Sequence, residues 1–316
     1  IINALILKVF KGQIIFISIL NNVFYLIAIY TFSLITKKLI NNNYSLIFIL
    51  ISIFLYPISE QPWHNFTLYM FFSIFILFYF LNGNKNKFYS GIFLGISTLS
   101  SFSFIYLAFI ILLIDFFLNF NKIKKFSNFS LISGFVLVLS IFFLTLFYQG
   151  LFEYWYSFKK FSNIFAEQSE SGTYINLLIN LFLSSLNLLF TKFNDYSFLL
   201  IFLLTSIFNI IFLFKVVKKK FQKKEILTNE KKLFIISISS IGFLYTCLNG
   251  IVGFKILLCT FVGLITFLYI CSNFDKDYKY FTLLIILIIT LHNIYPFKST
   301  TNRFFPNSNV TQNSEI

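Results

Sequence analysis

The sequence predicts an all-α fold, a polytopic transmembrane helix bundle. Of its 316 residues, 58% are hydrophobic and only 11% are charged, and the mean hydropathy is +0.84. Apolar runs long enough to cross a bilayer recur along nearly the whole chain, and no stretch between them is long enough for a soluble domain. We therefore expect residues 1–296 to form a single transmembrane domain, followed by a loose polar C-terminal tail at 297–316.

About ten apolar runs are expected to span the membrane. The second run is short for a hydrocarbon core of about 30 Å, which requires about 20 helical residues, so we expect it to be tilted or only partly inserted. The fourth and fifth runs could instead form one long helix, kinked around Ser97, Ser100, Ser101 and Ser103. In chain order the expected spans are 13–36, 44–57, 65–81, 88–101, 102–118, 128–148, 196–214, 233–249, 254–272 and 280–296.

Clusters of lysine set the expected orientation of these spans, because positively charged loops stay in the cytoplasm. The clusters lie at 37–38, 85–87, 122–125 and 215–232. The last of them holds eight Lys and two Glu and is expected to be a basic cytoplasmic loop that is also attracted to anionic lipid. The turn at 58–64 and the segment 149–195 then lie outside. Membrane topology thus accounts for the net charge of +14, and nothing in the chain resembles a nucleic-acid-binding module.

The external segment 149–195 is expected to hold two amphipathic interfacial helices. Between residues 176 and 191, Asn, Ser and Thr recur at spacings of three or four and form one polar stripe on an otherwise apolar helix. Residues 151–165 show the complementary pattern, an apolar stripe flanked by polar side chains. If the helix at 174–190 lies in the interface and does not cross the membrane, the basic segment 215–232 stays on the cytoplasmic side.

The sequence Ile-Ser-Glu-Gln-Pro-Trp-His-Asn at 58–65 is the most informative polar interruption of the chain. Pro62 cannot continue a helix and pushes Gln61 out of the α region. Glu60, Trp63 and His64 share the same tight turn, which must lie at a membrane boundary or line a cavity, because lipid-exposed irregular backbone would leave polar groups unsatisfied. A polytopic membrane enzyme keeps its chemistry at such a position. An ordinary Trp/His interfacial anchor has the same appearance.

Cysteines and charged residues inside the expected spans are interpreted as structural. Cys247, Cys259 and Cys271 lie in or at the ends of apolar runs, and their spacing matches no metal or redox motif. We interpret them as small apolar side chains. Asp115 and Lys255 lie near the ends of their spans, where they can snorkel to the interface or cap a helix.

Three stretches of the first half carry a resemblance to a known family. Residues 4–12, Ala-Leu-Ile-Leu-Lys-Val-Phe-Lys-Gly, lead into the first expected span, and residues 56–66 run from the polar turn into the third. Residues 89–100, Tyr-Ser-Gly-Ile-Phe-Leu-Gly-Ile-Ser-Thr-Leu-Ser, form a helix of small residues. Over roughly residues 1–150 this arrangement resembles the integral-membrane glycosyltransferases of the GT-C superfamily, especially bacterial members similar to dolichyl-phosphate-mannose mannosyltransferases and aminoarabinose transferases. Family members often carry a Thr-Lys pair where Ser100 and Ser101 stand here.

The resemblance implies transfer of a sugar from a polyprenyl-phosphate-linked donor to a lipid, glycan or protein acceptor on the external side of a bacterial inner membrane. In this family an acidic residue of the first external loop acts as catalytic base or metal ligand. The chain begins at Ile1, its single methionine is Met70, and no signal-peptide pattern opens it. We therefore expect a fragment of a longer protein that lacks this loop. Whether the enzyme needs a divalent metal cofactor stays open, and no residue of this chain is assigned as a metal ligand.

Sugar transfer with inversion needs a base for the acceptor and positive charge for the lipid phosphate. Glu60 and His64 are the candidate catalytic residues of this chain. The candidates for binding substrate are Gln61, Trp63, Lys159, Lys160 and Arg303. Simpler roles compete with each, such as a boundary imidazole for His64, lysines that meet lipid head groups and a solvated arginine in the tail.

Two other functions remain open. A transporter or flippase for a lipid or polysaccharide usually shows internal repeats and charged residues at mid-depth in the membrane, and neither is evident here. A non-catalytic membrane subunit is the other alternative. The coding sequence upstream of Ile1 distinguishes them from the enzyme, because an external loop with one or two carboxylates would favour glycosyl transfer.

Overall fold

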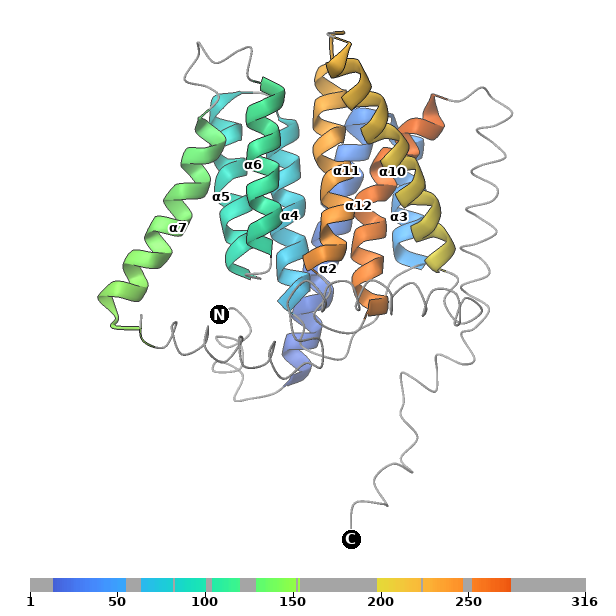
Figure 1. Ribbon diagram of the computed structural model, residues 1–316. Helices are drawn as coiled ribbons and strands as arrows, with labels where there is room; N and C mark the ends of the chain where they lie inside the picture. The colour runs from blue at the N-terminus through green and yellow to red at the C-terminus, as the bar shows by residue number, and fades with distance from the viewer. Residues whose placement is uncertain are drawn as a thin grey trace, which may run out of the picture.

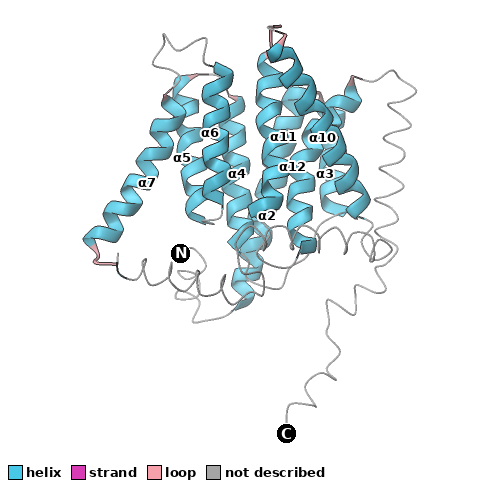
Figure 2. Ribbon diagram, viewed as in Figure 1, coloured by secondary structure: helices cyan, strands magenta, loops and turns pink. Residues whose placement is uncertain are grey.

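The computed structural model describes residues 14–54, 64–81, 83–100, 104–119, 129–151, 153, 198–222, 224–246 and 252–273. Within these ranges the chain forms nine α-helices and no strand, so the predicted all-α class is confirmed there (Figure 2). The helices are α2 (Ile14–Leu39), α3 (Asn42–Phe54), α4 (His64–Phe80), α5 (Asn84–Ser100), α6 (Ile105–Asn119), α7 (Ser130–Tyr148), α10 (Phe198–Phe221), α11 (Thr228–Thr246) and α12 (Val252–Ser272). Each overlaps one of the expected apolar runs, and the tenth run, 280–296, lies outside the described residues.

The helices stand side by side in one bundle, and successive helices run in opposite directions (Figure 1). In the second half of the chain, α12 packs against α10 and α11 and also reaches α2 and α3. In the first half, α4 lies between α2 and α5, and α7 packs mainly against α5. Helix α6 joins the two halves because it packs against α11 as well as α5.

The fourth and fifth expected spans do not merge into one kinked helix. Phe104, the residue before α6, contacts Phe72 of α4 with ring centroids 5.6 Å apart, and Asp115 of α6 contacts Tyr79 of α4. Helix α6 therefore runs parallel to α4 and antiparallel to α5. The hydroxyl of Ser97 donates to the Phe93 carbonyl at 2.7 Å and thus bonds within its own helix. The aromatic contact with α4 is gained only if the chain reverses between α5 and α6, which explains the correction.

Aromatic side chains fill the centre of the bundle between α2, α4 and α12. Tyr25 is fully buried and meets Phe66, Tyr69 and Phe261 at ring-centroid distances of 5.9, 6.0 and 5.7 Å. Phe32, two turns further along α2, contacts Tyr69 at 5.4 Å. Such edge-to-face and offset pairs add to the stability from burial, and they fix the relative heights of α2 and α4.

Glycines bring α5 and α7 into backbone contact. A Cβ placed on Gly91 would lie 2.1 Å from the Leu131 carbonyl oxygen, and one placed on Gly134 would lie 2.2 Å from the Phe88 carbonyl oxygen. Gly95 follows Gly91 by one turn, so the small residues form the spacing that lets two membrane helices approach closely. The small-residue stretch 89–100 therefore serves helix packing.

Large apolar side chains cover much of the outside of the bundle. In the described part of the chain, two helices, Ile19–Leu39 and Ser130–Tyr148, are long and apolar enough to cross a membrane, and most of the second is not buried. Shorter apolar helices accompany them, and α3, with 13 residues, has a length of roughly 20 Å. Exposed apolar side chains include Tyr106, Phe109, Leu113 and Phe117 on α6, Leu137, Ile141, Leu144 and Phe147 on α7, and Ile207, Ile211 and Phe214 on α10.

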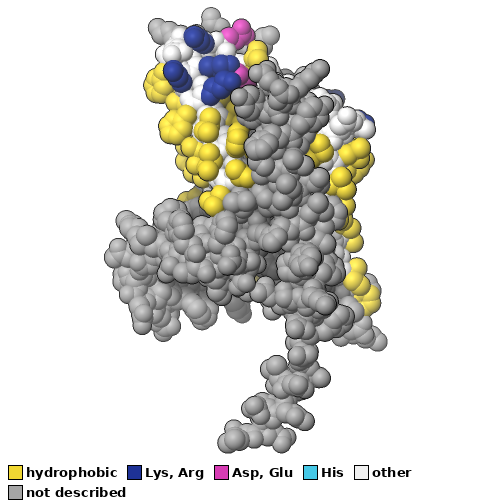
Figure 3. Space-filling model, turned by 90° about the vertical axis from the view of Figure 1, so that its right-hand side faces the viewer, with side chains coloured by type: hydrophobic (Ala, Val, Ile, Leu, Met, Phe, Trp, Pro, Cys, Tyr) yellow, Lys and Arg dark blue, Asp and Glu magenta, His cyan; other side chains and the backbone are white. Residues whose placement is uncertain are grey.

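Lysines of four described helices gather at one end of the bundle. On the face drawn in Figure 3, lysine side chains lie above a band of hydrophobic side chains. The helices that contribute are α2 through Lys37 and Lys38, α5 through Lys85 and Lys87, α10 through Lys218, Lys219 and Lys220, and α11 through Lys231 and Lys232. We call this the lysine end. The sequence predicts a basic loop over residues 215–232. This prediction is wrong in part, because residues up to 221 continue α10 and residues from 228 begin α11.

Candidate functional site

The residues predicted for catalysis and substrate binding lie largely outside the described part of the chain. His64 is the first residue of α4, and nothing is described of its side chain. The others, Glu60, Gln61, Trp63, Lys159, Lys160 and Arg303, lie outside the described residues, as do the two expected interfacial helices apart from their first residues near 149–153. What is described is that α4 begins within this polar stretch, at His64, so His64 and Asn65 are helical and do not belong to a turn. This start of α4 lies at the end of the bundle opposite the lysine end (Figure 1).

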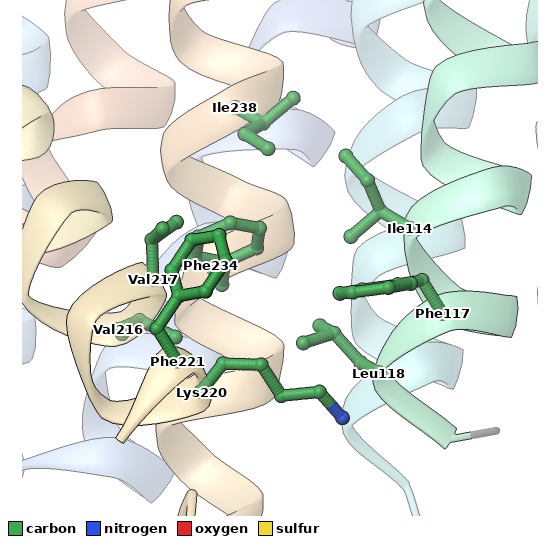
Figure 4. Close-up of a pocket in the computed structure, with 9 residues that line it drawn as sticks. All are labelled: Ile114, Phe117, Leu118, Val216, Val217, Lys220, Phe221, Phe234 and Ile238. Atoms are coloured by element: carbon green, nitrogen blue, oxygen red, sulfur yellow. The ribbon is translucent and has the colours of Figure 1, made fainter. Parts of the chain in front are cut away.

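A crevice of about 420 Å³ opens between α6 on one side and α10 and α11 on the other (Figure 4). Its volume falls within the usual range of small-molecule sites, ~300–1,000 Å³. It lies beside the last turns of α6 and α10, at the lysine end. The lining is apolar except for one lysine and consists of Ile114, Phe117, Leu118, Val216, Val217, Lys220, Phe221, Phe234 and Ile238.

Lys220 supplies the only charge in this lining. Its side chain extends from α10 toward α6, and its Nζ lies 5.2 Å from the centroid of the Phe117 ring (Figure 4). An ammonium over an aromatic face is attracted by the ring's quadrupole, an interaction of ~0.5–1 kcal/mol at an exposed position. With one ammonium group in an otherwise apolar described lining, the crevice can bind an amphiphile with an anionic group.

The corner between α10 and α11 is fixed by Glu230. Lys219 donates to Glu230 Oε1 at 2.6 Å, and the backbone N–H of Leu227 donates to Glu230 Oε2 at 3.2 Å. The second bond satisfies an N–H group at the start of α11 and corresponds to one half of a capping box. One carboxylate thus ties both helices together beside the crevice.

Lys232 joins α11 to α4 at the same end. Its Nζ donates to the Phe80 carbonyl oxygen at 2.8 Å and lies 5.2 Å from the Phe80 ring centroid. Burial lowers the pKa of this ammonium to about 8, and repulsion from Lys38 and Lys87 contributes. Repulsion of this kind acts between nearby charges, so Lys38 of α2 and Lys87 of α5 are near Lys232 at this end.

Asp115 is buried and does not snorkel to the surface, contrary to expectation. It is 3% exposed, and Tyr79 donates a hydrogen bond to its Oδ1 at 2.5 Å. The correction follows from the pairing of α4 with α6, which no local pattern of the sequence reveals. Cys271, in contrast, is fully buried, as predicted for a small apolar side chain.

A buried amide lies at the opposite end of the bundle, near the start of α4. Asn21 is fully buried, and neither its Nδ2 nor its Oδ1 has a hydrogen-bond partner. It lies one turn before Tyr25, which contacts Phe66 near the start of α4, so Asn21 is close to the depth at which α4 begins. Unsatisfied buried amides are rare and costly. Sequence reasoning missed Asn21, although an Asn inside an apolar run was the available signal.

Polar side chains also join the last three helices. Asn209 Nδ2 donates to the carbonyl oxygens of Thr205 at 2.6 Å and Gly263 at 3.0 Å. Ser237 donates to Thr266 Oγ1 at 3.1 Å between α11 and α12. Such contacts stabilise helix association where apolar surroundings offer no water. Within the described residues, no group of three or more His, Cys, Asp or Glu side chains could hold a metal ion.

Comparisons with protein-family models, with curated proteins and with solved structures find no match for this chain. The resemblance to membrane glycosyltransferases is therefore argued from the residues of the chain itself.

Proposed function

We propose that this chain is the membrane domain of a glycosyltransferase, with about ten spans, that takes a sugar from a polyprenyl-phosphate-linked donor outside the cytoplasm. The observation that carries the proposal is where α4 begins. Its first residue, His64, belongs to the polar stretch 58–65, and the helix begins at the end of the bundle opposite the lysine end, which the positive-inside rule makes the external end.

The distribution of apolar and charged side chains supports a membrane location. Exposed apolar patches larger than a few hundred Å² are unusual on soluble proteins. Here exposed Ile, Leu and Phe side chains run along α6, α7 and α10. Above this apolar band lie the lysines of Figure 3, as anionic lipid head groups would favour.

The chemistry of the external end supports transfer of a polar group there. In the proposed reaction Glu60 accepts the proton of the acceptor hydroxyl, and His64 assists beside it. Gln61 and Trp63 contact the sugar, and Lys159, Lys160 and Arg303 hold the lipid phosphate. The unpartnered amide of Asn21 lies at the same depth and can accept a polar ligand group.

Sugar transfer in proteoliposomes tests the proposal. The full open reading frame that contains this chain is incubated with polyprenyl-phosphate-linked glucose, mannose or aminoarabinose, and release of the polyprenyl phosphate is measured. Glu60→Gln should lower kcat at least tenfold, whereas Glu153→Gln, at an exposed carboxylate near the same end, should not. Equal rates for the two variants, or no release from any donor, would overturn it.

Lipid transport is the second candidate, and the crevice at the lysine end favours it. A flippase needs a place for a lipid chain at the leaflet from which the lipid leaves, and the apolar lining beside Lys220 provides one. Transport of fluorescent lipid between leaflets, without breakage of the donor, would favour this function over sugar transfer.

A further inference from the structure

The crevice between α6, α10 and α11 has the lining of a hydrocarbon site. Eight of its nine lining side chains are apolar, from Ile114 on α6 to Ile238 on α11. A polar metabolite would lose its hydration there without gaining hydrogen bonds in return. An alkyl chain would instead bury apolar surface on three helices at once.

Charge identifies which amphiphile fits. Lys220 Nζ lies over the Phe117 ring beside the crevice. Its neighbour Lys219 is paired with Glu230, but no salt bridge joins Lys220 to a carboxylate among the described residues. Exposed Lys224 and the amines of Lys231 and Lys232 add to the positive potential at this end. Basic pockets between membrane helices on the cytoplasmic side attract anionic lipid head groups.

We propose that this crevice binds an anionic phospholipid of the leaflet at the lysine end. One acyl chain lies between α6 and the α10–α11 pair, and the lipid phosphate contacts Lys220. The crevice lies at the other end of the bundle from the start of α4 at His64, so lipid binding there is independent of the proposed sugar transfer. It makes α6 and the α10–α11 pair, which come from different halves of the chain, share one bound lipid.

Lipid binding is measured with the full chain in detergent. Phosphatidylglycerol and phosphatidylcholine with identical acyl chains are compared. Native mass spectrometry measures how much of each lipid the protein retains, and thermal denaturation measures how far each lipid raises the unfolding midpoint. Long-chain phosphatidylglycerol should bind at one site and raise the midpoint more than phosphatidylcholine does. Dihexanoyl phosphatidylglycerol should bind weakly, because its chains are too short to fill the crevice, and inorganic phosphate should have no effect.

Two variants locate the site. Lys220→Gln should weaken phosphatidylglycerol binding about tenfold, which corresponds to ~1.4 kcal/mol, while Lys224→Gln, with the same charge change at an exposed lysine, should leave it nearly unchanged. Val217→Trp should fill the crevice from a position that is 37% exposed, so that the protein still folds, and should abolish binding of the long-chain lipid.

Three results would overturn the assignment. Equal binding of the two long-chain lipids would remove the role of the anionic head group. Equal losses in Lys220→Gln and Lys224→Gln would indicate diffuse attraction by the whole lysine end. Stabilisation by inorganic phosphate alone would identify an anion site without a role for the acyl chain. None of these measurements uses a sugar donor, so they are separate from the test of glycosyl transfer.

Discussion

The Tyr79 hydroxyl donates a hydrogen bond of 2.5 Å to Asp115 Oδ1 across the interface between α4 and α6. Both side chains are buried, with exposures of 6% and 3%. A buried carboxyl group is costly unless hydrogen-bonded, so the pair constrains where α6 can stand beside α4. With the Phe72–Phe104 contact near the other end of α6, it fixes the parallel alignment of the two helices.

Replacement of Tyr79 by Phe should destabilise the protein by ~1–3 kcal/mol, because it removes a hydrogen bond from a buried carboxyl group. The measurement is the free energy of unfolding in detergent. Tyr89→Phe is the matched control, since Tyr89 is 47% exposed and the same atom is removed. Equal stability of the two variants would show that the Tyr79–Asp115 bond does not hold α4 and α6 together.

Gly91→Ala should separate α5 from α7. The new methyl group would lie 2.1 Å from the Leu131 carbonyl oxygen, and backbone cannot move aside as a flexible side chain can. Overpacking typically costs ~1–3 kcal/mol, and we expect the upper part of this range. Gly95→Ala should cost less, because its methyl group meets the Val138 side chain at 2.8 Å.

Thermal denaturation in detergent gives this ranking, with Lys85→Ala as an exposed control on α5. A Gly91→Ala variant as stable as Lys85→Ala would mean that α5 and α7 do not pack through their backbones.

Helix positions were predictable from the sequence, whereas helix pairing was not. Each described helix overlaps an expected apolar run, because apolar runs of this length are typical of helices. The lysines at 37–38, 85–87 and 218–220 meet at one end, as their alternation along the chain predicted. The reversal between α5 and α6 depends on contacts such as Phe72–Phe104, which join residues far apart in sequence.

Sequence reasoning about the site emphasised isolated polar residues and missed paired ones. The sequence predicts that Asp115 snorkels to the interface or caps a helix and that Lys232 belongs to a basic loop. In the structure each has a specific partner on α4. The crevice at Lys220 had no sequence signal, because an apolar lining on three helices resembles any other lipid-facing surface. Glu60 and its neighbours remain predictions from the sequence, outside the described residues.

Removal of the Glu230 carboxylate should loosen the corner between α10 and α11. Glu230→Ala loses the bond to the Leu227 N–H and the pair with Lys219, and we expect a cost of ~1–2 kcal/mol. Glu230→Gln keeps an acceptor for the N–H group and should cost less. Glu225→Ala removes an exposed carboxylate from the same connection and is the control. If Glu225→Ala is equally destabilising in urea unfolding, the corner does not depend on Glu230.

The two ends of the bundle should face opposite sides of the membrane. Single cysteines at position 224, near the lysine end, and at position 153, near the opposite end, test this in a background without the native cysteines. A membrane-impermeant maleimide added to intact cells should label Glu153→Cys, and Lys224→Cys should react only after the membrane is opened. Labelling of both from outside would contradict the positive-inside orientation and the external position of the polar turn.

Lys232 gives the lysine end a pH dependence of known sign. Its pKa is lowered to about 8 in the folded protein from 10.5, first by burial and then by Lys38 and Lys87. Between these values the unfolded chain holds a proton that the folded chain has released. Unfolding therefore takes up a proton, and the free energy of unfolding rises with pH in this window.

Lys232→Gln should flatten the rise in stability between about pH 8 and 10, because glutamine can still donate to the Phe80 carbonyl oxygen but does not titrate. As the pH falls from 10 to 8, the wild type should lose stability that the variant keeps, because the variant forms no unfavourable buried charge. Lys87→Gln should flatten the rise in part, by removing one source of repulsion, whereas exposed Lys85→Gln should not. Chemical unfolding at a series of pH values provides the measurement, and parallel curves for wild type and Lys232→Gln would show that the ammonium of Lys232 is not desolvated in the folded protein.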